Sequence, residues 1–179
     1  LVQLFEARWS DAAFESHLEA GSAVHALARR AFEFIRDSVR AGKTIGEYDV
    51  QQEVFRLYES FGIQADEPLA VSVNENTGNP HYSPTATSSL SIRPGDLVLI
   101  DAWAKLRMPG AVYFDITWTG FVGAEVPTRY TEIFQIVKEA RDTAVEFIQQ
   151  SVRAGRPIRG YQVDDAARGV ITRHGYGDY

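Results

Sequence analysis

The chain has 179 residues, of which 45% are apolar and 23% charged. That is enough for one globular domain with a real core. Its net charge of -6 and the lack of a Lys/Arg-rich run argue against a nucleic acid partner, because phosphate binding needs concentrated positive charge. Without cysteine, disulfides, thiolate metal sites and a cysteine nucleophile are excluded.

No stretch is apolar enough for a membrane span, and the N-terminus lacks the pattern of a signal peptide. We therefore expect no membrane partner and a cytoplasmic location. Because the first residue is Leu1 rather than methionine, we also expect the chain to be part of a longer protein.

The first third of the chain predicts two helices. Apolar residues recur at spacings of three and four over residues 24–39, and Gly42 suits a left-handed helix cap. Residues 44–47 have the form of a capping box, and a second amphipathic pattern follows over 50–61.

The middle third predicts strands, and the last third returns to helices. β-Branched and aromatic residues are enriched in the expected strands, with Pro-Gly turns between them. We expect strands at about 69–73, 97–104 and 112–122, and helices at about 133–148 and 161–174.

The two helical regions resemble each other at an offset of 113 residues. Residues 31–50 and 144–163 are identical at twelve of twenty positions, including a shared Ser-Val-Arg-Ala-Gly on largely polar positions. This predicts a duplicated unit of helix, helix and antiparallel sheet in an α+β fold. Repeat 1 would span about 10–123, and repeat 2 would begin at about 128–179 without its sheet.

Two aspartates lie inside strands that are otherwise strongly apolar. If Asp101 and Asp115 belong to one hairpin whose loop centres near Met108, they are predicted to be direct cross-strand partners. Facing carboxylates repel unless something neutralises them. A divalent cation, a shared proton and simple solvent exposure at a strand edge are the alternatives that the residue types leave open.

The segments around these aspartates resemble the strand pair of the pita-bread metallopeptidases. They are Gly95-Asp-Leu-Val-Leu-Ile-Asp101 and Asp115-Ile-Thr-Trp-Thr-Gly-Phe-Val-Gly123. The family includes methionine aminopeptidases, X-prolyl aminopeptidases, prolidases and creatinase, and the X-prolyl peptidases are the most similar. The resemblance implies a pita-bread fold, which is also built from a duplicated helix and sheet unit.

The resemblance also implies roles for individual residues. Asp101 and Asp115 would be ligands of a site for two divalent ions, such as Mn, Co, Zn or Fe. His81, in Asn79-Pro-His-Tyr-Ser-Pro84, would contact the substrate and handle a proton. Thr117 would lie in the outer shell of the metal. The implied activity is hydrolysis of N-terminal peptide bonds, including X-Pro bonds, in peptides with a free N-terminus.

Two departures from the family pattern qualify these expectations. The gap between the aspartates is longer than usual, which predicts an enlarged hairpin tip at 105–110. The family's third ligand is a histidine and its last two are glutamates further along. His174 is not that histidine, so we expect this chain alone neither to hold both ions nor to catalyse.

Two other functions are open on the sequence. One is a pita-bread module that binds proteins without catalysis, and the other is a creatinase-like C–N hydrolase. The presence of Asp101, Asp115 and His81 favours the peptidase over both. The oligomeric state is also open, with a homodimer among the alternatives.

Overall fold

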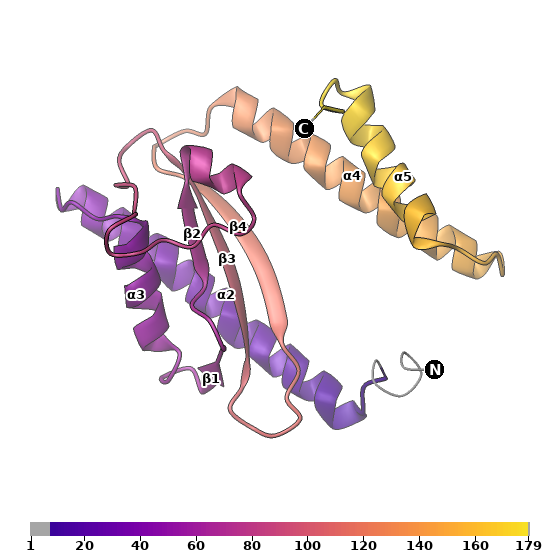
Figure 1. The fold of residues 1–179 in the computed structure, drawn as a ribbon, viewed down its shortest axis with the longest axis horizontal. Helices are drawn as coiled ribbons and strands as arrows, with labels where there is room; N and C mark the ends of the chain where they lie inside the picture. Colours follow the sequence, from indigo (N-terminus) through magenta and orange to yellow (C-terminus); the bar gives the residue numbers. More distant parts are fainter. Residues whose placement is uncertain (1–7, 179) are drawn as a thin grey trace. The chain divides into compact units, whose positions relative to one another are not determined.

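A computed structural model describes residues 8–178. The chain divides into unit 1, Leu1–Ala124, and unit 2, Glu125–Tyr179. Unit 1 contains a sheet with its helices, and unit 2 is a pair of helices (Figure 1). In the described part of the chain, no helix is both long and apolar enough to cross a membrane.

Unit 1 begins with helices α2, Asp11–Arg40, and α3, Glu47–Leu57. The Ser10 hydroxyl caps α2 by accepting from the backbone N of Ala13 at 3.2 Å. Gly42, at φ +67°, lies just beyond the C-cap of α2, as expected.

The predicted cap of the second helix is wrong in its position. The N-cap is Gly46 rather than Thr44. The Asp49 carboxylate accepts from the backbone N of Gly46 at 2.8 Å. A capping box needs its acidic residue three positions after the cap, and Asp49, not Glu47, occupies that position. Glu47 is therefore free for another role.

The strands form one antiparallel sheet around a central strand, β3, Leu97–Leu106. On one side β3 pairs with β1, Ile63–Gln64, and with β2, Ala70–Val73. On its other side it pairs with β4, Phe114–Phe121. A short 3-10 helix, η1, Asn74–Gly78, follows β2 and opens the loop that leads back to β3.

One face of the sheet is covered by helices. Helix α2 packs against β3 and β4, and α3 packs against β2 (Figure 1). Alternate residues of β3 enter the core between these layers, namely Val98, Ile100, Ala102 and Ala104. Where α2 approaches β4 most closely, a Cβ on Gly120 would come within 2.5 Å of the Phe32 ring. A side chain at this position would therefore push the two layers apart.

Unit 2 is a helical hairpin in which α4, Thr128–Arg153, packs against α5, Gly160–Arg173. Its junction repeats details of unit 1. Gly155, at φ +63°, follows the C-cap of α4, and Gln162 Oε1 accepts from the backbone N of Arg159 at 2.9 Å. These matched caps support the proposed duplication, whose boundaries remain a prediction.

Candidate metal-binding site

The sheet presents both aspartates on the face opposite the helices. Because neighbouring residues of a strand point to opposite faces, Asp101 and Trp103 lie on the face opposite buried Ile100 and Ala102. On β4, Asp115 and Thr117 occupy the same open face.

The predicted pairing of Asp101 with Asp115 is wrong by one step of the ladder. Asp101 is opposite Thr117, and Trp103 is opposite Asp115. The hairpin turns one residue later than expected, between Leu106 and Phe114. The two aspartates are therefore diagonal neighbours, whose Cα atoms are typically about 7–8 Å apart. They still share a face, because the partner of Asp101 changes by two residues along β4, from 115 to 117, and residues two apart in a strand point to the same face.

Electrostatics couples the two carboxyl groups. Asp115 is largely exposed as a residue, but partial desolvation of its carboxyl group raises its pKa above the ordinary value, and the negative charge and hydrogen bond of Asp101 raise that pKa further. Thr117 donates from Oγ1 to Asp101 Oδ1 at 2.6 Å, which orients the Asp101 carboxylate. Two acids held this close are unfavourable for the metal-free fold.

This repulsion leads to a prediction for the metal-free chain. The pKa of Asp115 is higher in the folded chain than in the unfolded chain. The folded chain therefore loses stability as pH rises from the unfolded pKa through the folded pKa, because Asp115 ionises less readily when folded. Asp115→Asn should therefore stabilise the chain at neutral pH by up to about 1 kcal/mol, the range of partly exposed charges. The gain should disappear below the ordinary Asp115 pKa.

Urea titrations of both proteins at neutral and acidic pH would measure this difference. Glu67→Gln is the control, because it removes a nearby exposed carboxylate with no shared hydrogen bond to Asp101. A stability gain for Asp115→Asn that is the same at all pH values would contradict the repulsion.

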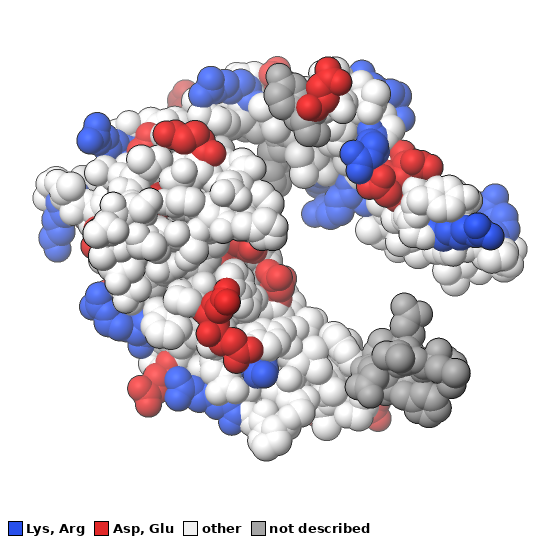
Figure 2. Space-filling view, viewed as in Figure 1, with Lys and Arg blue, Asp and Glu red and all other residues white. Residues whose placement is uncertain are grey.

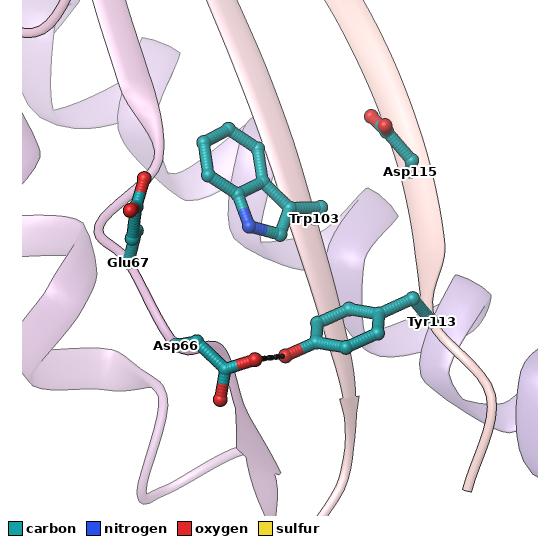
Figure 3. A pocket seen from close by; sticks show the side chains of 5 residues that line it. All are labelled: Asp66, Glu67, Trp103, Tyr113 and Asp115. Atoms are coloured by element: carbon teal, nitrogen blue, oxygen red, sulfur yellow. Dashed lines mark hydrogen bonds between the residues drawn. The ribbon is translucent and has the colours of Figure 1, made fainter.

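Beside Asp115 the open face is hollowed into a pocket of about 360 Å³. Trp103 and Asp115 contribute from β3 and β4, Tyr113 from the hairpin, and Asp66 and Glu67 from the segment between β1 and β2 (Figure 3). The pocket thus combines two aromatic side chains with three carboxylates, a lining suited to an apolar group that carries a positive charge.

The long hairpin contributes directly to this pocket. Tyr113 donates from its hydroxyl to Asp66 Oδ2 at 2.8 Å (Figure 3), and Lys105 Nζ lies 4.7 Å from the centre of the Tyr113 ring. His17 Nδ1 lies 2.7 Å from the Tyr113 carbonyl oxygen. Tyr113, at the end of the hairpin turn, is therefore anchored at the rim of the pocket.

His81 lies apart from the aspartates in the chain, on the loop between η1 and β3, where it is exposed. Its backbone N donates to Asn79 Oδ1 at 3.0 Å. The structure thus brings Asp101, Asp115 and Thr117 together on the sheet, whereas His81 is placed by a separate segment.

The residues of this face fit part of a site for divalent ions. Carboxylate oxygens are suitable ligands for hard and borderline cations, and Asp101 and Asp115 present two carboxylates on the same face of the sheet. Within residues 8–178, however, no three His, Asp or Glu side chains gather in a way that could hold a metal ion. The two aspartates are therefore a partial ligand set.

Charge over the rest of the surface is mixed. On the face shown in Figure 2, acidic and basic side chains occur singly or in small groups, without a broad positive area. This distribution is consistent with the overall charge of -6.

The chain belongs to metallopeptidase family M24, which it matches over residues 17–179. The two carboxylates on the open face of an antiparallel sheet are thus found in a member of a metal-dependent family. The α+β pita-bread fold inferred from the sequence is confirmed by the solved structures that it matches.

Individual relatives are dipeptidases and an aminopeptidase, two of them named for X-Pro substrates. The chain is 28% identical to an Xaa-Pro dipeptidase of Lactobacillus helveticus over 163 residues, which are 89% of this chain and 39% of that protein. It superposes on a dipeptidase from Mycobacterium ulcerans with a TM-score of 0.79 at 21% identity, over 99% of this chain and 43% of that one.

A third match is an X-prolyl aminopeptidase from Caenorhabditis elegans, described as a cytosolic enzyme with a di-nuclear active site. The TM-score is 0.70 at 18% identity, with 98% of this chain and 28% of that chain covered. The chain therefore spans well under half the length of these relatives.

Several site residues were not found from the sequence. Asp66 and Glu67 lie in an irregular segment without periodicity, and Tyr113, two residues before Asp115, lies in a predicted strand where an aromatic residue is ordinary. Only the folding of the β1–β2 segment against the hairpin shows that they share a pocket. The spacing of Trp103 two residues after Asp101 did contain a signal, because it places both on one face of a strand.

Proposed function

We propose that this chain supplies the first ligands of a dinuclear metal site in a peptidase that cleaves N-terminal peptide bonds, with X-Pro peptides as the preferred substrates. The observation that supports this most strongly is the pair Asp101 and Asp115 on one open sheet face, with the pKa of Asp115 raised through burial and Asp101. Family membership and the X-prolyl relatives point the same way.

Within this proposal, each residue has a defined task. Asp101 and Asp115 would bind two divalent ions of Mn, Co, Zn or Fe, and Thr117 would hold Asp101 in its ligating orientation through the 2.6 Å bond. When bound, the ions would supply an activated water and polarise the scissile carbonyl. His81 would donate a hydrogen bond to the substrate and hold a proton during the reaction.

The pocket beside Asp115 would receive the N-terminal residue of the substrate. A free ammonium group is positively charged, and Asp66, Glu67 and Asp115 surround the pocket with negative charge. Trp103 and Tyr113 would contact the apolar part of that residue. The hairpin bounds the pocket. A change in the length of the hairpin would therefore affect which substrates bind more than it would affect the hydrolysis step.

We also propose that residues 1–179 alone neither retain both ions nor hydrolyse peptides. Two carboxylates are too few ligands for two ions that each need four to six, and no larger group is found in the described residues. We further propose that the duplicated units span about 10–123 and 128–179. The complete protein would be cytoplasmic, with a homodimer as its assembly.

The test is hydrolysis by a protein that contains this chain within a complete domain. Loaded with Mn²⁺ or Co²⁺, it should cleave X-Pro dipeptides faster than dipeptides without proline, lose activity with a chelator and regain it when the metal is returned. N-terminal acetylation of the substrate should strongly reduce cleavage. Residues 1–179 alone should show no turnover under the same conditions.

Two results would overturn this function. Full occupancy by metal without cleavage of any dipeptide would favour a binding module. Activity on a C–N bond that persists after complete metal removal would favour a creatinase-like hydrolase.

A further inference from the structure

We infer that Glu47, at the first turn of α3, is the positioning residue for the loop that carries His81. Its significance for catalysis rests on the proposed function of His81. The inference itself concerns the loop of residues 74–90, and it is drawn from a buried carboxylate that the metal site does not use.

Glu47 is completely buried and accepts four hydrogen bonds. Its Oε1 accepts from the backbone N of Val73 at 2.7 Å and from Asn76 Nδ2 at 2.9 Å. Its Oε2 accepts from the Tyr82 hydroxyl at 2.6 Å and from the backbone N of Leu90 at 2.7 Å. One carboxylate therefore binds both ends of the loop and a residue in its middle.

A buried carboxylate is stable only where such donors replace water. The position of Glu47 as the first residue of α3 adds the favourable field of a helix N-terminus. Burial and the bond to Glu47 also raise the pKa of Tyr82 to about 12, so the Tyr82 hydroxyl keeps its proton and donates at neutral pH.

A second buried side chain on α3 supports the same segment. Gln51, one helical turn after Glu47, donates from Nε2 to the Leu69 carbonyl at 2.8 Å and to Ser83 Oγ at 3.4 Å. Helix α3 thus holds Tyr82 and Ser83, the two residues that directly follow His81. The bond from His81 N to Asn79 fixes the preceding side.

The fold of the helix pair does not itself require this glutamate. At the offset of 113 residues, the position of Glu47 is taken by Gly160. Helix α5 still begins at Gly160, with Gln162 capping Arg159 as Asp49 caps Gly46. Glu47 is therefore specific to the copy whose following loop contains His81.

The deciding experiment measures backbone order in Glu47→Gln by ¹⁵N relaxation of this chain. A glutamine offers one carbonyl oxygen, and its NH₂ group would face a backbone N–H donor, that of Val73 or of Leu90, which it cannot bind. We expect order parameters at residues 79–84 to fall from about 0.85 to below about 0.6, while those of β3 stay unchanged. Glu53→Gln, at a half-buried position of α3 that forms an ion pair with Arg56, should leave the loop ordered.

A milder pair of variants serves if Glu47→Gln does not fold. Tyr82→Phe removes one bond to Glu47, and Tyr113→Phe removes the comparable bond to Asp66. Loosening of residues 79–84 in Tyr82→Phe but not in Tyr113→Phe would support the inference. Unchanged order at His81 in both Glu47→Gln and Tyr82→Phe would overturn it.

Kinetics in the complete domain separates this inference from the function proposed for His81. Glu47→Gln should lower kcat by about 10- to 100-fold with metal content unchanged, because it displaces His81 and not the ligands. If the loop loosens but kcat stays at the wild-type value, Glu47 still positions the loop and the role of His81 in hydrolysis is refuted.

Discussion

Asp101→Ala and Asp115→Ala, each made in a protein with the complete catalytic domain, are expected to lose bound metal and nearly all peptidase activity. The two carboxylates lie on one face of the β3–β4 ribbon. If both are ligands, as proposed, removing either leaves an incomplete coordination sphere. Loss of an outer-shell partner typically costs 10- to 100-fold, so loss of a ligand should cost more than about 1,000-fold in kcat/KM.

The same reasoning ranks two further variants. Thr117→Ala removes the 2.6 Å hydrogen bond that orients Asp101 without removing a proposed ligand. We therefore expect kcat/KM to fall by about 10- to 100-fold. Glu67→Gln is the charge-matched control. Glu67 lines the same pocket but is not a proposed ligand, so metal content should be unchanged and only KM should rise.

Metal content is measured on the purified proteins by elemental analysis, and activity is measured with an X-Pro dipeptide. Circular dichroism should show that the variants remain folded, since Asp115 is exposed and Asp101 only half-buried. Equal metal content in the parent protein and both aspartate variants would refute the ligand assignment.

Ile100→Ala is expected to have the largest effect on stability, with a loss of about 2–5 kcal/mol. Ile100 is completely buried in the central strand, between the sheet and its helices, and truncation leaves a cavity lined by well-packed neighbours. Leu99→Ala is the matched control. It removes a similar volume from the adjacent residue, which points to the open face and is only half-buried.

Chemical unfolding of both variants measures the difference, and a linear dependence of stability on urea concentration gives each free energy. Equal losses in the two variants would mean that both faces of β3 are packed, contrary to the alternation seen here. The comparison therefore also tests which face of the sheet is available to the metal site.

Helix and strand positions were largely predictable from the sequence. The apolar spacing over 24–39 identified α2. The helix begins earlier, at Asp11, and its start was missed because the first turns have fewer apolar residues. The β-branched and aromatic content of 97–104 predicted β3, and the structure places Asp101 and Trp103 on one face of that strand. Such local periodicity is decided by which side chains must leave water.

The pairing of Asp101 with Thr117 could not be predicted from the same pattern. Periodicity assigns a residue to a face, but the partner across the ribbon depends on where the chain turns. At the end of the turn, Tyr113 contacts Asp66 and His17, residues distant in the sequence. The residue pattern alone fits a turn one residue earlier equally well.

What the sequence by itself determined is the family and the candidate residues: two carboxylates in apolar strands, and a histidine in a motif that resembles the X-prolyl peptidases. What only the tertiary structure decided is how these groups are held, through the diagonal placement of Asp101 and Asp115 and the clamp of Glu47 on the His81 loop. The reason is physical, because hydrogen bonds of buried polar groups join segments far apart in the chain, and no local pattern of residues specifies which segments will meet.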